Sequence, residues 1–321
     1  MSKYWQDKKV LITGHEGFLG SNLTKTLLAL GADIVGLDKV KDKPGSILSG
    51  LRRDIVCIKG DISDMELVKR VINKYKPEVI FHIAAEAIVG RANKYPVEAF
   101  RSNIEGTWNI LESSRTRSFI EAIVVASSDK AYGSHKILPY KEDAALKGAH
   151  PYDVSKSCTD LICHTYWNTY KTPVCVTRCG NIYGPGDLNF SRLIPDAVRC
   201  ALKNKKFTIR SDGKFTRDYV YVGDIVNGYI MLAEKMKRSR LYGEAFNFSD
   251  ENPITVIEMA KNIYNLAGQK PDYEILNSAK YEIKHQYLCS KKARKVLGWM
   301  PEYTLNEGLK STIEWYKHVK K

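Results

Sequence analysis

The sequence predicts a doubly wound parallel α/β sheet, and three observations lead to this fold class. Short apolar runs alternate with segments of helical periodicity over residues 9–178. A glycine-rich turn joins the first apolar run to the first helical segment. Small or polar residues follow the later apolar runs directly. Because the ligands of such sheets bind beyond the carboxyl ends of the strands, we expect the functional site at that edge.

Composition favours an ordinary globular enzyme. The 321 residues are 44% hydrophobic and 27% charged, and no apolar run approaches the roughly 18 residues of a membrane span. The first nine residues hold no apolar signal core, so we expect a cytoplasmic protein with no membrane partner. The seven cysteines are scattered without a C-x-x-C pair, which predicts neither disulfides nor a metal site.

The net charge of +14 would suit an anionic partner. Nucleic acid is disfavoured, because the lysines are spread along the chain and their densest groups hold few aromatic residues for base stacking. A phosphorylated metabolite remains the better match.

The first unit is a strand over residues 9–12, a turn with the spacing G-x-x-G-x-x-G, and a helix marked by Leu23, Leu27 and Leu30. Glycines let the backbone approach a pyrophosphate, whose charge then sits on the helix N-terminus. This Rossmann-type unit predicts a dinucleotide site. Its candidate residues are Gly14, Gly17, Phe18, Leu19 and Gly20.

The second strand, residues 32–37, ends at Asp38. A carboxylate there can accept hydrogen bonds from the adenosine ribose and repels a 2′-phosphate, which favours NAD over NADP. Lys39 and Lys41 follow closely and keep NADP open. A third strand, residues 56–59, precedes Asp61 and Ile62, which we expect to flank the adenine.

A helix over residues 63–75 leads to a buried strand, residues 78–83. It ends at Ala84 and Ala85, whose small side chains would let a dinucleotide lie close. His82 is expected to be structural. A helix over residues 96–117 and a strand over residues 123–126 follow.

Tyr152 and Lys156 lie four residues apart at the start of a helix over residues 152–170, so they share one face. A nearby ammonium and a cationic nicotinamide would lower the phenol pKa toward the working pH. Tyr152 could then take a proton from a substrate hydroxyl that Ser128 holds, while a hydride leaves the same carbon.

Motifs along the whole chain resemble the extended short-chain dehydrogenase/reductase family, in particular its NAD-dependent nucleotide-sugar epimerases and dehydratases. The resemblance implies a nucleoside-diphosphate sugar as substrate and a homodimer built through the helices after Pro96 and Tyr152. It also adds Asn103 and Ser127 to the cofactor-binding candidates. The matching residues are Thr13, Gly14, Gly17, Phe18, Leu19, Gly20, His82, Ala84, Ala85, Asn103, Gly106, Thr107, Asn109, Ser127, Ser128, Tyr152, Lys156, Arg178, Asn181, Tyr183, Gly184, Pro185, Leu297, Gly298, Trp299, Pro301 and residues 216–222 with Asp224.

Asp129 and Lys130 favour one branch of this family. Epimerases usually carry small or neutral residues here, whereas the pair resembles the Asp-Lys of CDP-glucose 4,6-dehydratases and of flagellin-type acetylglucosamine dehydratases. Elimination of water needs a base at carbon 5 and an acid at the carbon 6 hydroxyl, which we assign to Lys130 and Asp129. The alternatives are a 4-epimerase, or a salt bridge between the two side chains that only stabilises the turn.

A smaller substrate-binding lobe is expected after the strand at residues 174–178, where turn residues become frequent. We assign residues 1–180 and about 219–245 to the NAD-binding domain, and 181–218 and 246–321 to the lobe. Helices are expected over residues 225–236, 254–267 and 305–319.

The substrate candidates come mainly from this lobe. The resemblance puts Asn181 on the substrate diphosphate and makes Arg192 a further contact, since residues 188–195 resemble the CDP-glucose branch. Arg217 is expected to clamp a phosphate through its bidentate fork. Arg91 is assigned either to the sugar side or to a structural ion pair. Residues 216–221 are closer to the epimerase pattern, so the nucleotide base stays open.

Overall fold

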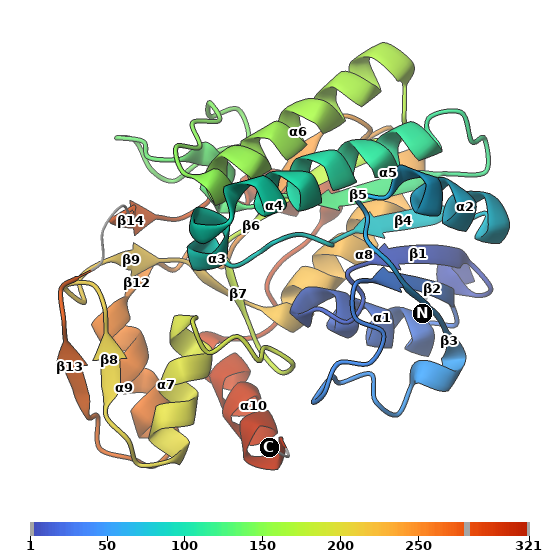
Figure 1. Cartoon of the computed structure of the whole chain (residues 1–321). Coiled ribbons are helices and arrows are strands. Elements are labelled where there is room, and N and C mark those ends of the chain that lie inside the picture. Colours follow the sequence, from blue (N-terminus) through green and yellow to red (C-terminus); the bar gives the residue numbers. More distant parts are fainter. Residues whose placement is uncertain (1–2, 279–282, 320–321) are drawn as a thin grey trace.

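The computed structural model describes residues 3–278 and 283–319. A large lobe with a central sheet between two layers of helices packs against a smaller lobe, and α10 lies beside the smaller one (Figure 1).

The central sheet has seven parallel strands in the order β11-β6-β5-β4-β1-β2-β3, which confirms the predicted fold class. The chain runs outward from β1 through β2 to β3 and then returns to β4 on the other side of β1. The order therefore reverses between β1 and β4, the place where doubly wound sheets bind ligands. The strands are β1 (Lys9–Thr13), β2 (Asp33–Asp38), β3 (Ile55–Lys59), β4 (Val79–His82), β5 (Ala122–Ala126), β6 (Val174–Cys179) and β11 (Ala245–Phe248).

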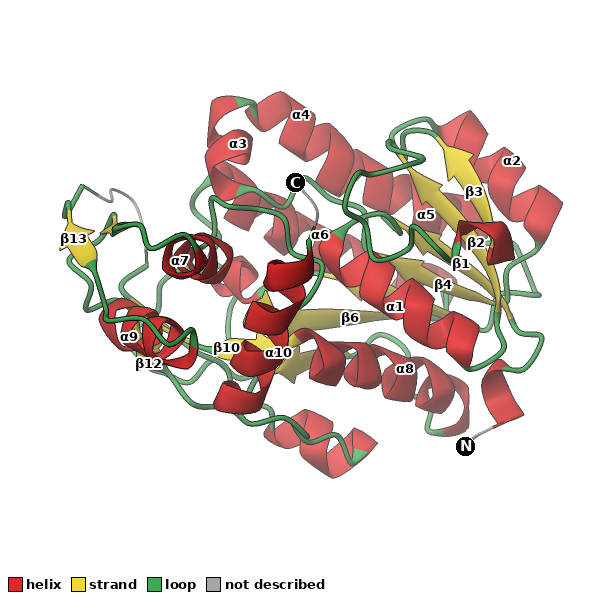
Figure 2. Cartoon of the chain, turned by 90° about the horizontal axis from the view of Figure 1, so that it is seen from below, coloured by secondary structure: helices red, strands yellow, loops and turns green. Residues whose placement is uncertain are grey.

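Helices cover both faces of the sheet because its strands are apolar on both sides (Figure 2). Ile12 and Phe81 belong to the core under one face, and their neighbours Leu11 and Ile80 belong to the core under the other. α1 (Phe18–Ala29) and α8 (Val222–Arg238) cover the first face. α2 (Met65–Tyr75), α5 (Gly106–Ser114) and α6 (Pro151–Tyr170) cover the second.

The helix predicted over residues 96–117 is interrupted. α4 (Pro96–Phe100) passes through a π-helical turn (Arg101–Glu105) into α5, which ends at Ser114. A short helix that the sequence did not predict, α3 (Val89–Lys94), precedes them. The π turn carries Asn103, and such turns occur frequently at functional sites.

The small lobe has its own apolar core under α7 (Leu193–Leu202), α9 (Val256–Leu266) and α10 (Leu305–His318). Thr255 and Thr304 form capping boxes with Glu258 and Glu307, which fixes where α9 and α10 begin. α7 and the short strands were not predicted. These strands are β8 (Phe207–Ile209), β9 (Thr216–Arg217), β12 (Ile254–Thr255), β13 (Tyr273–Ile275) and β14 (His285–Gln286), with β7 (Asn181–Tyr183) and β10 (Tyr219–Tyr221) paired beside them.

Within residues 3–278 and 283–319, no helix combines the length and the apolarity that crossing a bilayer requires. The same residues hold no group of three or more side chains arranged to bind a metal ion. All seven cysteines are free thiols.

Candidate active site

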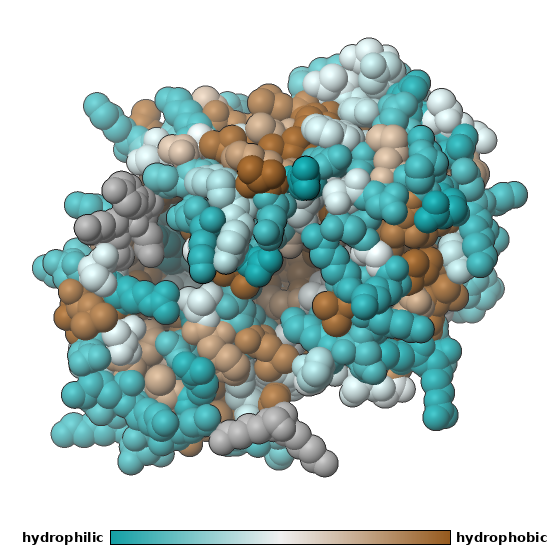
Figure 3. Space-filling view, viewed as in Figure 1, coloured by the Kyte–Doolittle hydropathy of each residue, from teal (hydrophilic) through white to brown (hydrophobic). Residues whose placement is uncertain are grey.

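A cavity of about 1010 Å³ lies between the carboxyl edge of the sheet and the small lobe, and the space-filling view shows the surface hollowed there (Figure 3). Most of the residues that the sequence singled out line it. They are Gly14, Gly17, Phe18, Leu19, Gly20, Asp38, Ile62, Ala84, Ala85, Arg91, Ser127, Ser128, Asp129, Lys130, Tyr152, Lys156, Asn181, Arg192 and Arg217. Asp61 and Asn103 are not among the lining residues.

The glycine turn is built for close backbone contact. Gly14 has a φ of +75°, which favours glycine, and a Cβ on Gly20 would lie 2.0 Å from the Gly14 carbonyl oxygen. Gly17 is the extended N-cap of α1, so the helix begins at Phe18 with its first N–H groups toward the cavity edge. This backbone and the adjacent small Ala84 fit a pyrophosphate.

Asp38 ends β2 and lines the cavity. Its two carboxylate oxygens accept hydrogen bonds from the backbone N–H groups of Glu16 and Val40, both at 3.1 Å. Two of the neighbouring cations are paired: Lys39 Nζ lies 3.0 Å from Asp61, and Arg52 Nε lies 2.9 Å from the buried Glu16 carboxylate. Asp61 therefore contacts Lys39 at the position where an adenine contact was expected.

Asn103 holds the loop after β4 in place. Its amide accepts from Glu86 N at 2.7 Å and donates to Glu86 O and to Ser155 Oγ on α6. His82 lies between the hydroxyls of Thr13 and Thr107, at 2.8 and 3.2 Å, and burial lowers its pKa to about 3. Both side chains position backbone rather than face the cavity.

Tyr152 and Lys156 share the cavity face of α6. Lys156 Nζ lies 5.9 Å from the Tyr152 ring centroid and donates to Ala126 O at 2.7 Å. Burial raises the pKa of Tyr152 to about 12, although its hydrogen bond with Ser128 and the charge of Arg192 act to lower it. Burial lowers the pKa of Lys156 to about 8. The expected lowering of the phenol pKa therefore depends on the positive charge that a nicotinamide would add.

A 3₁₀ turn (Asp129–Tyr132) follows β5, with Ser128 as its N-cap. Ser128 Oγ accepts from Lys130 N at 3.2 Å and donates to Asp129 Oδ1 at 2.9 Å. Lys130 Nζ donates to the Oε1 atom of Gln286 on β14. Among the described residues, Asp129 and Lys130 form no ion pair with each other, so the turn is not held by a salt bridge between them.

The sequence did not predict a buried ion pair that lies beside the turn after β5. Asp160 Oδ1 lies 2.6 Å from Arg178 Nη2, and its other oxygen accepts from Ser127 Oγ. Arg178 Nη1 also donates to Tyr132 OH at 2.7 Å. Asp160 follows Lys156 by four residues on one helix face, a spacing that could have revealed it. The pair fixes the end of β5 against α6.

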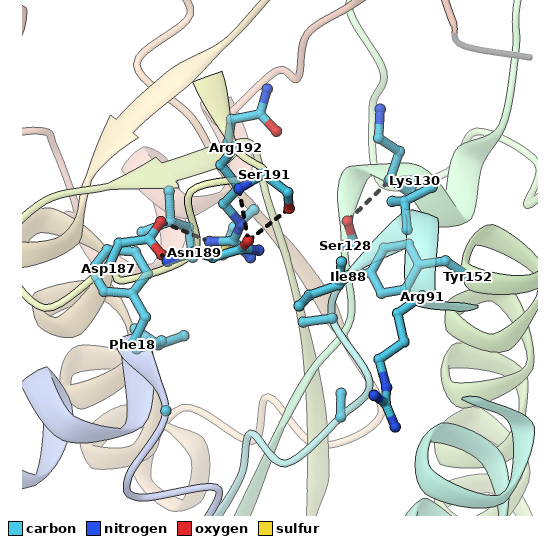
Figure 4. Close-up of a pocket in the computed structure, with 18 of the residues that line it drawn as sticks. Phe18, Ile88, Arg91, Ser128, Lys130, Tyr152, Asp187, Asn189, Ser191 and Arg192 are labelled. Atoms are coloured by element: carbon cyan, nitrogen blue, oxygen red, sulfur yellow. Dashed lines mark hydrogen bonds and ion pairs between the residues drawn. The ribbon is translucent and has the colours of Figure 1, made fainter. Parts of the chain in front are cut away.

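The small lobe supplies the opposite wall of the cavity (Figure 4). Arg192, just before α7, lies 3.2 Å from Asp187, and Arg217 on β9 donates to the carbonyls of Thr216 and Lys284. Asn181 opens β7 and lines the cavity. Asp187, Asn189 and Ser191 stand beside Arg192 and face Ser128, Lys130 and Tyr152 across the opening.

Arg91 forms ion pairs with Glu86 at 2.7 Å and with Glu98 at 3.0 Å, although it also borders the cavity. Of the two roles predicted for Arg91, a sugar contact or a structural ion pair, the structure contains the ion pair.

Residues 10–248 match the model of the NAD dependent epimerase/dehydratase family. The chain belongs to this family. A CDP-glucose 4,6-dehydratase from Salmonella typhimurium is 31% identical, with 98% of this chain and 92% of that protein covered. The predicted family and enzyme class are thereby confirmed.

Two solved structures have the same fold. A UDP-glucose 4-epimerase from Thermotoga maritima, determined with UDP-glucose, superposes with a TM-score of 0.88 at 28% identity, over 96% of this chain and 98% of that one. A dTDP-glucose 4,6-dehydratase from Bacillus anthracis, in complex with NAD, gives a TM-score of 0.85 at 30% identity, over 97% and 96%. Relatives of this chain thus include both dehydratases and epimerases.

Proposed function

We propose that the chain is an NAD-dependent nucleotide-sugar 4,6-dehydratase acting on a nucleoside-diphosphate glucose, with CDP-glucose as the leading candidate. The observation that carries the proposal is the turn after β5. It places an acid, Asp129, and an amine, Lys130, at the cavity beside Tyr152, without an ion pair between the two. Oxidation at carbon 4 alone requires only Tyr152, Lys156 and Ser128, so the additional acid and base point to elimination.

The glycine turn, Asp38, Ile62, Ala84 and Ala85 would hold the dinucleotide, and Ser127, Tyr152 and Lys156 would flank its nicotinamide end. NAD is favoured over NADP because Asp38 is anionic and the nearby cations Lys39 and Arg52 are already paired with acids. When bound, the nicotinamide would accept the hydride from carbon 4 and return it to carbon 6.

The chain's own groups move the protons. Tyr152 takes the proton of the carbon 4 hydroxyl, which Ser128 orients, and Lys130 then takes the proton of carbon 5. Asp129 gives a proton to the carbon 6 hydroxyl, which leaves as water. Lys130 returns its proton to carbon 5 when carbon 6 is reduced. The sugar loses one water, and the net transfer of a proton from Asp129 to Tyr152 is reversed through solvent.

Asn181, Arg192 and Arg217 are assigned to the diphosphate side of the substrate, because they form the wall opposite the catalytic turn and two of them are cationic. The domain limits given by the sequence stay a prediction, because β11 (Ala245–Phe248) completes the central sheet although residues 246–321 were assigned to the substrate lobe.

A cytoplasmic homodimer completes the proposal. Apolar side chains gather on the surface over α4 and α6 (Figure 3), where Val97 and Leu161 are exposed, and Trp108 is exposed on α5. A second copy covering these helices would bury them in a four-helix arrangement.

The test is incubation of the purified protein with CDP-glucose, dTDP-glucose and UDP-glucose, followed by mass spectrometry and sugar analysis. Loss of one water with formation of a keto group supports the dehydratase. An isomeric product of unchanged mass establishes instead the second candidate, a 4-epimerase, which the resemblance to the Thermotoga enzyme favours.

Size-exclusion chromatography with light scattering measures the oligomeric state in the same preparation.

A further inference from the structure

Gln286 is the side chain that meets the catalytic Lys130, and nothing in its sequence position suggests this. It lies 156 residues further along the chain, on β14, a strand of two residues paired with β9. In the register of that pair it lies opposite Arg217, which lines the cavity. Gln286 is fully buried, and it is not among the residues that line the cavity. It therefore stands directly behind Lys130 as seen from the substrate space.

Only one end of the Gln286 amide has a hydrogen-bond partner among the described residues. Its Oε1 atom accepts from Lys130 Nζ. Its Nε2 atom is buried and has no hydrogen-bond partner within residues 3–278 and 283–319. A buried polar group without a partner destabilises the folded state, so the amide stays here at a cost to stability.

This contact matters because Lys130 must exist in two states during the proposed reaction. The ammonium and the neutral amine both have N–H donors for the Oε1 atom, so the lone pair of the neutral amine stays available for the carbon 5 proton. A carboxylate at the same place would favour the ammonium strongly. An amide adds no charge in either case.

We infer that Gln286 is a positioning residue for Lys130, and this inference rests on the proposed function. The Gln286 amide hydrogen-bonds the Lys130 amine in both protonation states. Lys130 can then take up the carbon 5 proton and give it back without leaving its place. The proton passes only between carbon 5 and Nζ, and the amide neither gains nor loses a proton.

Other charged groups act on Lys130 as well. Asp129 lies on its own turn, Asp153 on α6 interacts with it electrostatically, and Arg217 stands opposite Gln286 on β9. A test must leave these groups unchanged and alter only the amide.

The experiment compares the wild-type protein with Gln286→Glu, which has nearly the same shape, and Gln286→Met, which cannot accept or donate a comparable hydrogen bond. Each protein is given CDP-glucose, dTDP-glucose and UDP-glucose in turn. Reduction of bound NAD is followed by absorbance in a single turnover, and loss of water is followed by mass spectrometry as a function of pH.

In Gln286→Glu, the acidic limb of the pH profile for water loss should move up by about one pH unit or more, because an adjacent anion stabilises the ammonium. Reduction of NAD should change less than about twofold, since Tyr152 and Lys156 are untouched. In Gln286→Met, water loss should fall at every pH by roughly tenfold or more, because the amine is no longer held.

The outcomes separate the two proposals. If the wild-type protein loses water but both variants keep its rate and its pH limb, Gln286 has only a structural role and the inference is overturned while the dehydratase stands. If the wild-type protein removes no water from any of the three sugar nucleotides, both are overturned.

Discussion

The two walls of the cavity are built by different means. On the cofactor side, contiguous segments that follow regular strands present mainly backbone and small side chains, as in the glycine turn and at Ala84. On the substrate side, charged side chains arrive from separate segments, such as Arg192 and Arg217. Close packing of backbone therefore shapes the cofactor side of the cavity, whereas charged side chains dominate the substrate side. Substitutions on the two sides should therefore impair different properties of the protein. The predictions below are ordered from the largest expected effect to the smallest.

The largest effect is expected at α6, the helix of the large lobe that presents Tyr152 and Lys156 to the cavity. Tyr152→Phe should lower both NAD reduction by substrate and water loss by roughly 10²- to 10⁴-fold, because the proton acceptor of the first step is removed. Absorbance of the reduced nicotinamide measures the first step. Tyr170→Phe, at the exposed end of the same helix, is the matched control and should leave both rates unchanged.

The second prediction separates the two chemical steps. Lys130→Ala should lower water loss by roughly 10²- to 10⁴-fold while bound NAD is still reduced by substrate, because the base acts only after oxidation. Lys136→Ala, on an exposed lysine of the following loop, is the control. If Lys130→Ala also abolished NAD reduction, the division of roles between Tyr152 and Lys130 would be wrong.

The third prediction addresses the wall made of backbone. Gly20→Ala puts a Cβ 2.0 Å from the Gly14 carbonyl oxygen, so the turn must shift and the bound NAD content of the purified protein should fall at least several-fold. The melting temperature should fall as well. Gly50→Ala meets no atom within 4 Å and should alter neither quantity. Equal NAD content in both variants would contradict the assignment of the glycine turn to the pyrophosphate of NAD.

A smaller effect is expected at the ribose end. Asp38→Ala should narrow the preference for NAD over NADP by roughly tenfold, because repulsion of the 2′-phosphate is removed while Lys39 and Arg52 keep their acidic partners. Equilibrium binding of both cofactors measures this. The control variant Asp54→Ala removes a charge from a residue that does not line the cavity. It should keep the wild-type ratio of NAD to NADP affinity.

The smallest effect concerns two buried carboxylates. Asp160 is paired with Arg178, whereas the partners of the Asp218 carboxylate among residues 3–278 and 283–319 are Ser249 and a backbone N–H, both at one oxygen. Burial raises the pKa of Asp218 from 3.8 to about 7. Since the folded state binds this proton more tightly, Asp218 stabilises the fold most below its ordinary pKa. The contribution is lost as the pH rises through about 7.

Asp218→Asn is neutral at every pH, so its melting temperature should decline less than that of the wild-type protein between about pH 5 and pH 8. The exposed Asp143→Asn should follow the wild-type curve. Parallel curves for all three proteins would show that Asp218 is ionised throughout this range.

The sequence was sufficient wherever function depends on local spacing. Each strand of the large lobe up to β6 follows from an apolar run, the glycine turn from its three glycines, and the shared face of Tyr152 and Lys156 from their separation of four residues. The turn after β5 could be located because parallel strands all end at one edge of the sheet.

Prediction was poorer where a residue depends on a distant partner. The interruption of the helix after Pro96 accompanies the buried contacts of Asn103 with Glu86 and Ser155, none of which is local. The two- and three-residue strands of the small lobe are too short for a periodic pattern. Arg91 forms ion pairs that composition alone left undecided.

The sequence by itself determined the family and the fold class and supplied the candidate residues for the proposed oxidation and elimination, because these are written in short motifs. Only the tertiary structure decided which groups surround them. It brings Asp160 and Arg178 behind Ser127, and Gln286 against Lys130 across 156 residues. The physical reason is that the protonation of a side chain depends on charges and hydrogen bonds within a few ångströms, whichever part of the chain supplies them.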